Sequence, residues 1–281
     1  MNCAWQAYID LFPLWTRSQI DFYRNDLLET RLRLGEAPEL RTRRGSLFLS
    51  RKVLPDDLRF VINMGSKYSP WAAESISRGY ITTQGGHRIG VCGVVAIHDG
   101  KINGIRTPTS LCVRVAREFP GIAKPLSNMK GSLLIIGSPG SGKTTLLRDL
   151  VRQISQSRDC AIAVVDERGE LFPNLDGKMM FTPGVRTDVM NSCGKAEGID
   201  MVLRSMTPMF IAVDEITRKE DCDALIRAAW CGVHLLATAH AGSIDDLKRR
   251  PIYQRMLESK VFQNIVVLKP DKTWTMEELH L

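Results

Sequence analysis

Eight consecutive residues carry the clearest chemical signal in this sequence: Gly137, Ser138, Pro139, Gly140, Ser141, Gly142, Lys143 and Thr144. They fit the pattern G-x-x-x-x-G-K-[ST] of a phosphate-binding loop. The glycines allow a tight turn in which successive backbone N–H groups converge on an anion. In such a loop the lysine reaches the β- and γ-phosphates, and the hydroxyl after it ligates Mg²⁺. We predict that ATP and Mg²⁺ bind to these residues and to Thr145, with an ordinary Gly/Ser turn as the alternative.

A second signal is an apolar segment, residues 210–213, that ends in Asp214 and Glu215. An apolar strand that ends in carboxylates after a phosphate-binding loop has the form of a Walker B segment. Asp214 would hold Mg²⁺ together with Thr144. Glu215 would either polarise the attacking water or position the groups that contact the metal and the water. A solvated strand end is the alternative.

Two further strand ends carry polar residues. Residues 163–165 lead into Asp166 and Glu167, either of which could be the base for a water beside the γ-phosphate; a salt-bridge cluster around Arg168 is the alternative. Residues 235–239 lead into His240, whose ring N–H could sense the γ-phosphate, although a lone histidine is usually structural.

The elements that must position these residues alternate between strand and helix from Lys130 onward. Strands are expected at residues 133–136, 160–165, 209–213 and 233–237, and helices at 144–157, 195–205 and 217–231. Thr217 and Glu220 have the spacing of a capping box, and Gly232 follows the helix end. This order predicts a wound α/β sheet with its ligands at the carboxyl ends of the strands.

The N-terminal part differs in character. Within the first 34 residues, we predict a helix that includes Leu27, Leu28 and Leu32, although residues 32–34 could already form a strand. A helix opened by Pro55, a β-hairpin over residues 80–97, a turn at Asp99-Gly100 and an alternating strand at 111–117 follow. Pro and Gly residues at 120–125 indicate a linker. We predict an α+β domain over residues 1–125 and an α/β domain over 126–281.

Composition restricts the class of protein. The 281 residues carry a net charge of +7, which is compatible with nucleotide, nucleic acid or an anionic membrane. Seven scattered cysteines without a C-x-x-C pair argue against disulfides and zinc. No signal peptide and no apolar run of about 18 residues is evident, so we expect a cytoplasmic protein, with peripheral association with a membrane through partners left open. We interpret the basic patch Arg41, Arg43 and Arg44 as a solvated face.

The order of these motifs resembles the ATPases of type II secretion, type IV secretion and pilus-motor systems. Segments 79–82, 86–90, 113–117 and 165–170 resemble the stage III sporulation protein AA family more specifically. The resemblance implies a RecA-like P-loop core with a smaller N-terminal domain, assembled as a hexamer. It implies an ATPase of the mother cell that energises a channel complex, with membrane-embedded channel proteins as partners. The acidic segment of secretion ATPases usually has the sequence Glu-Asp-Pro, whereas this chain has Asp166-Glu167-Arg168. The resemblance therefore does not identify which carboxylate is the catalytic base.

The resemblance also implies a cation supplied to the γ-phosphate, with Arg114, Arg117, Arg186 and Arg204 as candidates; ordinary surface arginines are the alternative. If Arg114 or Arg117 acts, ATP would hold domains or subunits together until hydrolysis. Two other functions stay open: a nucleotide-regulated nucleic-acid-binding protein, and a scaffold that binds ATP only to oligomerise. We do not expect nucleic acid as a partner, because the basic residues are spread out and lack an aromatic ladder.

Overall fold

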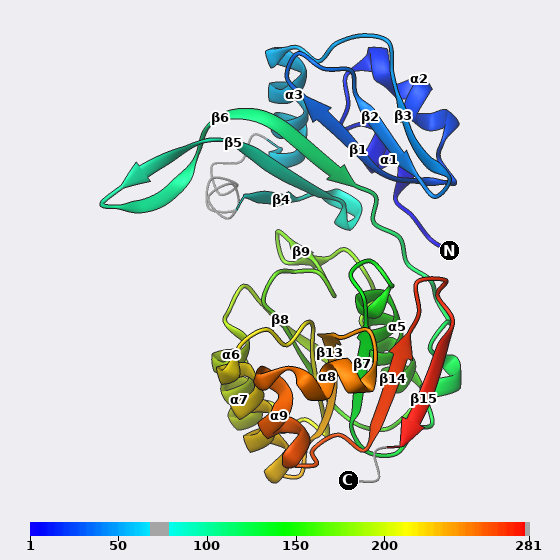
Figure 1. Cartoon of the computed structure of the whole chain (residues 1–281), viewed down its shortest axis with the longest axis vertical. Helices are drawn as coiled ribbons and strands as arrows, with labels where there is room; N and C mark the ends of the chain where they lie inside the picture. Colours follow the sequence, from blue (N-terminus) through cyan, green and yellow to red (C-terminus); the bar gives the residue numbers. More distant parts are fainter. Residues whose placement is uncertain (68–78, 279–281) are drawn as a thin grey trace. The chain divides into compact units, whose positions relative to one another are not determined.

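The protein is described from a computed structural model, which covers residues 1–67 and 79–278 (Figure 1). Its contacts divide the chain into unit 1, Met1–Arg117 with Leu175–Met180, and unit 2, Glu118–Asn174 with Phe181–Leu281. We expected the boundary after residue 125. The segment before that point instead belongs to unit 2, because the Asp149 carboxylate accepts hydrogen bonds from the backbone N–H groups of Gly121 and Ala123, at 3.1 and 2.8 Å.

Unit 1 is built on a six-stranded antiparallel sheet with the order β3-β2-β1-β6-β5-β4. Its core lies between this sheet and the helices, which contribute Tyr8, Ile20 and Leu58. The elements are α1 (Trp5–Ile9), α2 (Leu14–Phe22), β1 (Leu27–Arg33), β2 (Glu39–Thr42), β3 (Gly45–Phe48), α3 (Pro55–Ser66), β4 (Tyr80–Thr82), η1 (Gln84–Gly86), β5 (Arg88–His98) and β6 (Lys101–Arg114).

The helix expected around Leu27, Leu28 and Leu32 is wrong, because these residues form β1. Leucine, arginine and glutamate favour a helix in isolation, but β1 pairs with β2 and β6 and buries Leu27 and Leu32. The helix opened by Pro55 and the hairpin are confirmed as α3 and β4–β5, and the Asp99-Gly100 turn has φ values of 49° and 73°. In the basic patch, Arg44 lies 3.3 Å from Asp26 and is largely exposed.

Unit 2 is built on a seven-stranded sheet with the order β11-β8-β12-β13-β7-β14-β15, parallel except for the last pair. Its strands are β7 (Leu133–Gly137), β8 (Ile162–Asp166), β11 (Thr187–Asn191), β12 (Phe210–Val213), β13 (His234–His240), β14 (Asn264–Leu268) and β15 (Trp274–Glu278). The chain leaves this unit at a short hairpin of β9 (Asn174–Leu175) and β10 (Lys178–Met179), because segment Leu175–Met180 is assigned to unit 1. The central strands β7, β8 and β12 are buried at every position, as expected for a sheet covered on both faces.

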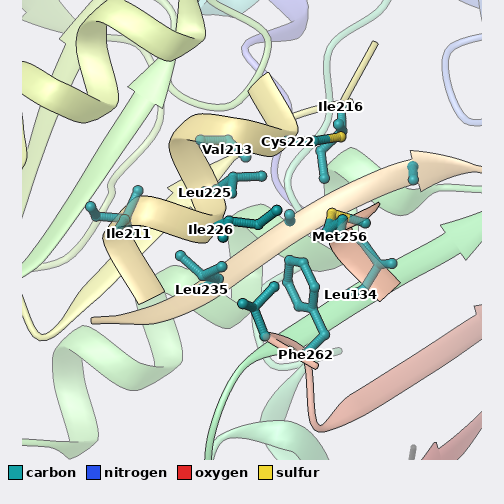
Figure 2. Packing of buried hydrophobic residues seen from close by; sticks show 14 of the residues in the cluster. Leu134, Ile211, Val213, Ile216, Cys222, Leu225, Ile226, Leu235, Met256 and Phe262 are labelled. Carbon is teal, nitrogen blue, oxygen red and sulfur yellow. The ribbon is translucent and has the colours of Figure 1, made fainter. Parts of the chain in front are cut away.

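The helices of unit 2 cover this sheet. They are η2 (Lys124–Leu126), α5 (Lys143–Ser157), α6 (Lys195–Ser205), α7 (Lys219–Trp230), α8 (Ile244–Arg249) and α9 (Pro251–Glu258). Figure 2 shows Leu225, Ile226 and Met256 from α7 and α9 packed with Ile211 and Leu235 from the sheet. None of the described helices has the length and apolar character needed to cross a bilayer.

The start of α7 differs from the expected capping box of Thr217 and Glu220. The helix begins at Lys219, and the Asp221 carboxylate accepts from the N–H groups of Arg218 and Thr217, at 3.1 and 3.3 Å. The cap is therefore shifted by one residue, because Asp221 reaches back to the free N–H groups that precede the helix.

Candidate active site

The glycine-rich loop joins the end of β7 to the start of α5, as the motif requires. Gly140 and Gly142 have φ values of 73° and 104°, a conformation that strains other residues. A Cβ on Gly137 would lie only 2.6 Å from both Ser141 Oγ and the Leu268 carbonyl oxygen. The first N–H groups of α5 have no intrahelical acceptor. Ser141 Oγ is buried and has no hydrogen-bond partner within the described residues. The loop therefore has the free N–H and hydroxyl donors that a phosphate needs.

Lys143 lies at the centre of a polar chain. Its ammonium donates to the carbonyl oxygens of Gly137 and Ser138, at 2.9 and 3.1 Å, and lies 3.0 Å from His240 Nδ1. His240 Nε2 lies 3.2 Å from Glu215 Oε1. A neutral imidazole protonated at Nε2 satisfies both contacts, because Nδ1 then accepts and Nε2 donates. Burial lowers the pKa of Lys143, while the Glu215 and Asp214 carboxylates act in the opposite direction.

Asp214 joins β12 to the loop and to β13. Its carboxylate accepts hydrogen bonds from the hydroxyls of Thr144, at 3.1 Å, and Thr238, at 2.8 Å. Burial raises the pKa of Asp214. A carboxylate beside a hydroxyl is a donor pair that suits Mg²⁺, which binds oxygen and keeps several waters. Thr144 and Asp214 therefore fit the metal expected from the sequence.

Glu215 is held in a strained backbone conformation, with a φ of 24°. Its N–H donates to Asp214 Oδ1 and Thr238 Oγ1, at 3.0 and 2.9 Å. Its side chain is 34% exposed and faces His240. These contacts place a partly accessible carboxylate beside Asp214 and Thr238.

Asp166, at the end of β8, is hydrogen-bonded to the loop that follows this strand. It is 1% exposed and accepts from the N–H groups of Glu170, Leu171 and Phe172, at 2.8 to 3.0 Å. Burial raises its pKa to about 6, although these N–H groups favour the charged form. These hydrogen bonds shape the loop after β8, and Asp166 also lines a pocket with Asp214 and Glu215.

Glu167 is neutralised by a lysine. Its carboxylate lies 2.5 Å from Lys195 Nζ, and the Lys195 side chain is only 5% exposed. Arg218 lies 3.8 Å away. Burial alone would raise the pKa of Glu167, but the Lys195 ammonium brings it below its ordinary value. Glu167 and Lys195 line one pocket together with Asp214 and Glu215, so the two acidic strand ends meet there.

The four arginine candidates are placed differently from one another. Arg117 is buried in unit 1, where it donates to the carbonyl oxygens of Leu27 and Arg24, at 2.6 and 2.8 Å. This anchoring corrects its assignment as a cation for a phosphate. The Arg114 side chain is 65% exposed, with Nε 3.6 Å from Glu29.

Arg186 and Arg204 lie at the opposite edge of the sheet from the loop. The Arg186 carbonyl accepts from Ile162, the first residue of β8, whereas Asp166 ends that strand. Arg204 is near the end of α6, whose first residue, Lys195, lines the acidic pocket; the 11-residue helix spans about 16 Å. Neither arginine reaches the site of its own chain.

Sequence reasoning missed two residues of the site, Thr238 and Lys195. Thr238 could have been found, because it lies two positions before His240 in one strand and therefore on the same face. The sequence indicates only that Lys195 begins a helix, and no local pattern links it to Glu167.

Comparisons with known proteins show the family of this chain and its fold. The family described as "Sporulation stage III, protein AA" matches residues 11–276. "Stage III sporulation protein AA" of Bacillus subtilis (strain 168) is 39% identical over 257 residues, which are 88% of this chain and 84% of that protein. "Protein SEEDLING PLASTID DEVELOPMENT 1" of Arabidopsis thaliana is 29% identical over 267 residues, 89% of this chain but 36% of that protein.

Two solved structures share the fold. The ATPase DotB of Legionella pneumophila is 18% identical with a TM-score of 0.56, over 93% of this chain and 78% of that one. The pilus retraction motor PilT with bound ADP is 18% identical with a TM-score of 0.55, over 88% and 76%. The expected fold class, a RecA-like P-loop core with a smaller α+β part, is confirmed. With a family match along almost its whole length, the chain belongs to the stage III sporulation protein AA family.

Proposed function

We propose that the protein is a Mg²⁺-dependent ATPase. The observation that carries the proposal is the convergence of two strand ends, those of β12 and β13, on the loop that follows β7. Lys143 contacts His240, His240 contacts Glu215, and the Thr144 hydroxyl contacts Asp214. A loop that only turned the chain would not need a carboxylate, an imidazole and a hydroxyl around its lysine.

In this proposal, the loop N–H groups and Lys143 hold the phosphates of ATP. Thr144 and Asp214 would hold Mg²⁺, which neutralises phosphate charge when it is bound. Glu215 takes the proton of a water whose oxygen bonds to the γ-phosphorus, and the bond from that phosphorus to the bridging oxygen breaks. His240 holds Glu215 and Lys143 in position through its two ring nitrogens.

Glu215 is a better base than either acid on β8. The Asp166 oxygens are occupied by backbone N–H groups, and Glu167 is paired with Lys195. A carboxylate that already neutralises an ammonium is a weaker proton acceptor. Glu215 instead faces the His240 ring and is 34% exposed.

The family and the fold also suggest a role for this ATPase in the cell. We propose that the ATPase works as a hexamer in the mother-cell cytoplasm during endospore formation. There it would energise a secretion-type channel through membrane-embedded partner proteins, by coupling hydrolysis to domain or subunit motion. Arg114, exposed on unit 1, is the proposed cation for a γ-phosphate; Arg186 and Arg204 could serve only a neighbouring subunit.

The test uses the purified chain with Lys143→Ala and, as a matched control, Lys130→Ala at an exposed position before β7. We expect Lys143→Ala to lower ATP turnover at least about 100-fold, because it removes a charge from the transition state, with an unchanged circular-dichroism spectrum. Lys130→Ala should behave as the wild type. Full Mg²⁺-dependent hydrolysis by Lys143→Ala would refute the proposal. Strong stimulation by DNA or RNA at low salt would favour the nucleic-acid alternative.

A further inference from the structure

A second lysine contacts the phosphate-binding loop. Lys272 lies in the turn between β14 and β15, and its ammonium donates to the Gly140 carbonyl oxygen at 2.5 Å. Its Cδ also lies 3.9 Å from the place where a Cβ would stand on Gly142. The turn therefore reaches the loop near both of its left-handed glycines.

The sheet keeps this turn in place. β14 is the parallel neighbour of β7, and Leu268 at its end is paired with Gly137 at the start of the loop. Within the turn, the Asp271 carboxylate accepts from the N–H and the hydroxyl of Thr273, at 3.0 and 2.6 Å. The Lys269 N–H donates to the Thr273 carbonyl, at 2.9 Å. Lys272 is thus presented by an ordered turn.

The backbone conformation at position 272 favours glycine over residues that have a Cβ. Lys272 has a φ of 72°, in the left-handed region that disfavours residues with a Cβ. The turn itself therefore gives no reason for a lysine. The position of the side chain explains the lysine, because its ammonium brings a positive charge to the phosphate-binding loop.

That charge adds to the charge already at the loop. Within residues 1–67 and 79–278, no ion pair involves Lys272, and its charge is among the causes that lower the pKa of Lys143. Two ammonium groups near one loop repel each other unless an anion lies between or beside them. A polyphosphate is such an anion.

Strand order tells which part of the nucleotide Lys272 can reach. β12 and β13, which carry Asp214 and His240, lie on one side of β7, and β14 lies on the other. If the proposed function is correct, the γ-phosphate lies toward Asp214 and His240. Lys272 then faces the part of the phosphate chain that ATP and ADP share.

We infer that Lys272 is a nucleotide-binding residue that contacts the α- or β-phosphate of ATP and ADP from the side opposite the reacting γ-phosphate. The inference rests on the proposed function and adds a residue to its binding site. It predicts a role in affinity, shared by substrate and product, and not in the chemical step.

The experiment measures the Kd of Mg-ADP and of a non-hydrolysable Mg-ATP analogue for the full chain by calorimetry. Lys272→Gln can still donate to the Gly140 carbonyl but carries no charge. Lys272→Gly removes the side chain and relieves the left-handed backbone. The matched control is Lys260→Gly, because Lys260 is also exposed, has a φ of 51° and lies outside the loop.

We expect both Lys272 variants to weaken binding of both nucleotides by about 10- to 100-fold, the range for a charge-assisted hydrogen bond. kcat should stay within about twofold while KM rises. Lys272→Gly and Lys260→Gly should both keep or raise the Tm, by about 2–4 °C, but only the first should lose affinity.

Three results in the variants would overturn the inference while leaving the proposed function intact. Wild-type affinity in both Lys272 variants would show that the lysine does not contact the nucleotide. Wild-type affinity in Lys272→Gln alone would show that the contact with Gly140 only shapes the loop. A loss confined to the ATP analogue would place Lys272 at the γ-phosphate. If the wild-type chain itself bound neither nucleotide, the proposed function would fail, and this inference with it.

Discussion

Two neighbouring strands of unit 2 end in the same dipeptide, and the two copies have different partners. β8 ends in Asp166-Glu167 and β12 is followed by Asp214-Glu215, with Val165 beside Val213 in the parallel register. Asp166 binds three N–H groups of its own loop, whereas Asp214 binds the hydroxyls of Thr144 and Thr238. Glu167 faces a lysine, and Glu215 faces a histidine.

The difference teaches that the chemistry of a carboxylate depends on what already occupies its oxygens. On β8 the partners are backbone N–H groups and an ammonium, which shape the loop and cancel the charge. On β12 the partners are hydroxyls and an imidazole, which also bind metal and transfer protons. Under the proposed function, the same dipeptide therefore supports a loop on one strand and takes part in the reaction on the next.

The sharpest test of this contrast compares Glu215→Gln with Glu167→Gln. Glu215→Gln should lower kcat about 10²- to 10⁴-fold, because it removes the proposed base, while nucleotide affinity stays near the wild-type value. Glu167→Gln should keep kcat within about tenfold, since its carboxylate is already paired with Lys195. Steady-state ATPase assays with calorimetric nucleotide binding decide it. The opposite ranking of the two kcat values would move the base to β8.

Asp166 gives a pH test of the supporting role. Its pKa in the folded protein is about 6, above its ordinary value of 3.8, so the folded state holds the proton more tightly than the unfolded state. The stability that this proton contributes is present below pH 4 and is lost as pH rises to about 6, a change of about 3 kcal/mol.

Asp166→Asn removes this titration, so the wild type should lose unfolding free energy relative to the variant between pH 4 and 6. Urea unfolding at several pH values measures the difference, and other carboxylates cancel in it. A wild type that instead gains on the variant as pH rises would mean that the three N–H groups outweigh burial at Asp166.

The pair of Glu167 and Lys195 should show the smallest effect. Lys195→Met removes the nearer ion-pair partner of Glu167, leaving Arg218 at 3.8 Å, and should lower the unfolding free energy by about 1–3 kcal/mol. This lies between the values for exposed and buried pairs, because Glu167 is 25% exposed. Adding Glu167→Gln should restore part of the loss in a double-mutant cycle of thermal or urea unfolding. Simple additivity of the two changes would show that the pair is not coupled.

The sequence by itself was enough to predict the phosphate-binding loop, the parallel sheet and the positions of Asp214, Glu215 and His240. The physical reason is locality: a strand, a glycine turn and a helix form the anion site within one stretch of chain. The carboxyl ends of parallel strands then meet at one edge without further information.

Only the tertiary structure decided which groups are free to react. Leu27 and Leu32 became strand residues through pairing with β2 and β6, against their helical preference. Our sequence analysis assigned no strand after residue 240, so it could not bring Lys272 to the loop. Hydrogen-bond and ion-pair partners are distant in the chain, as Lys195 is from Glu167, and only the folded arrangement determines which carboxylate is satisfied and which remains accessible.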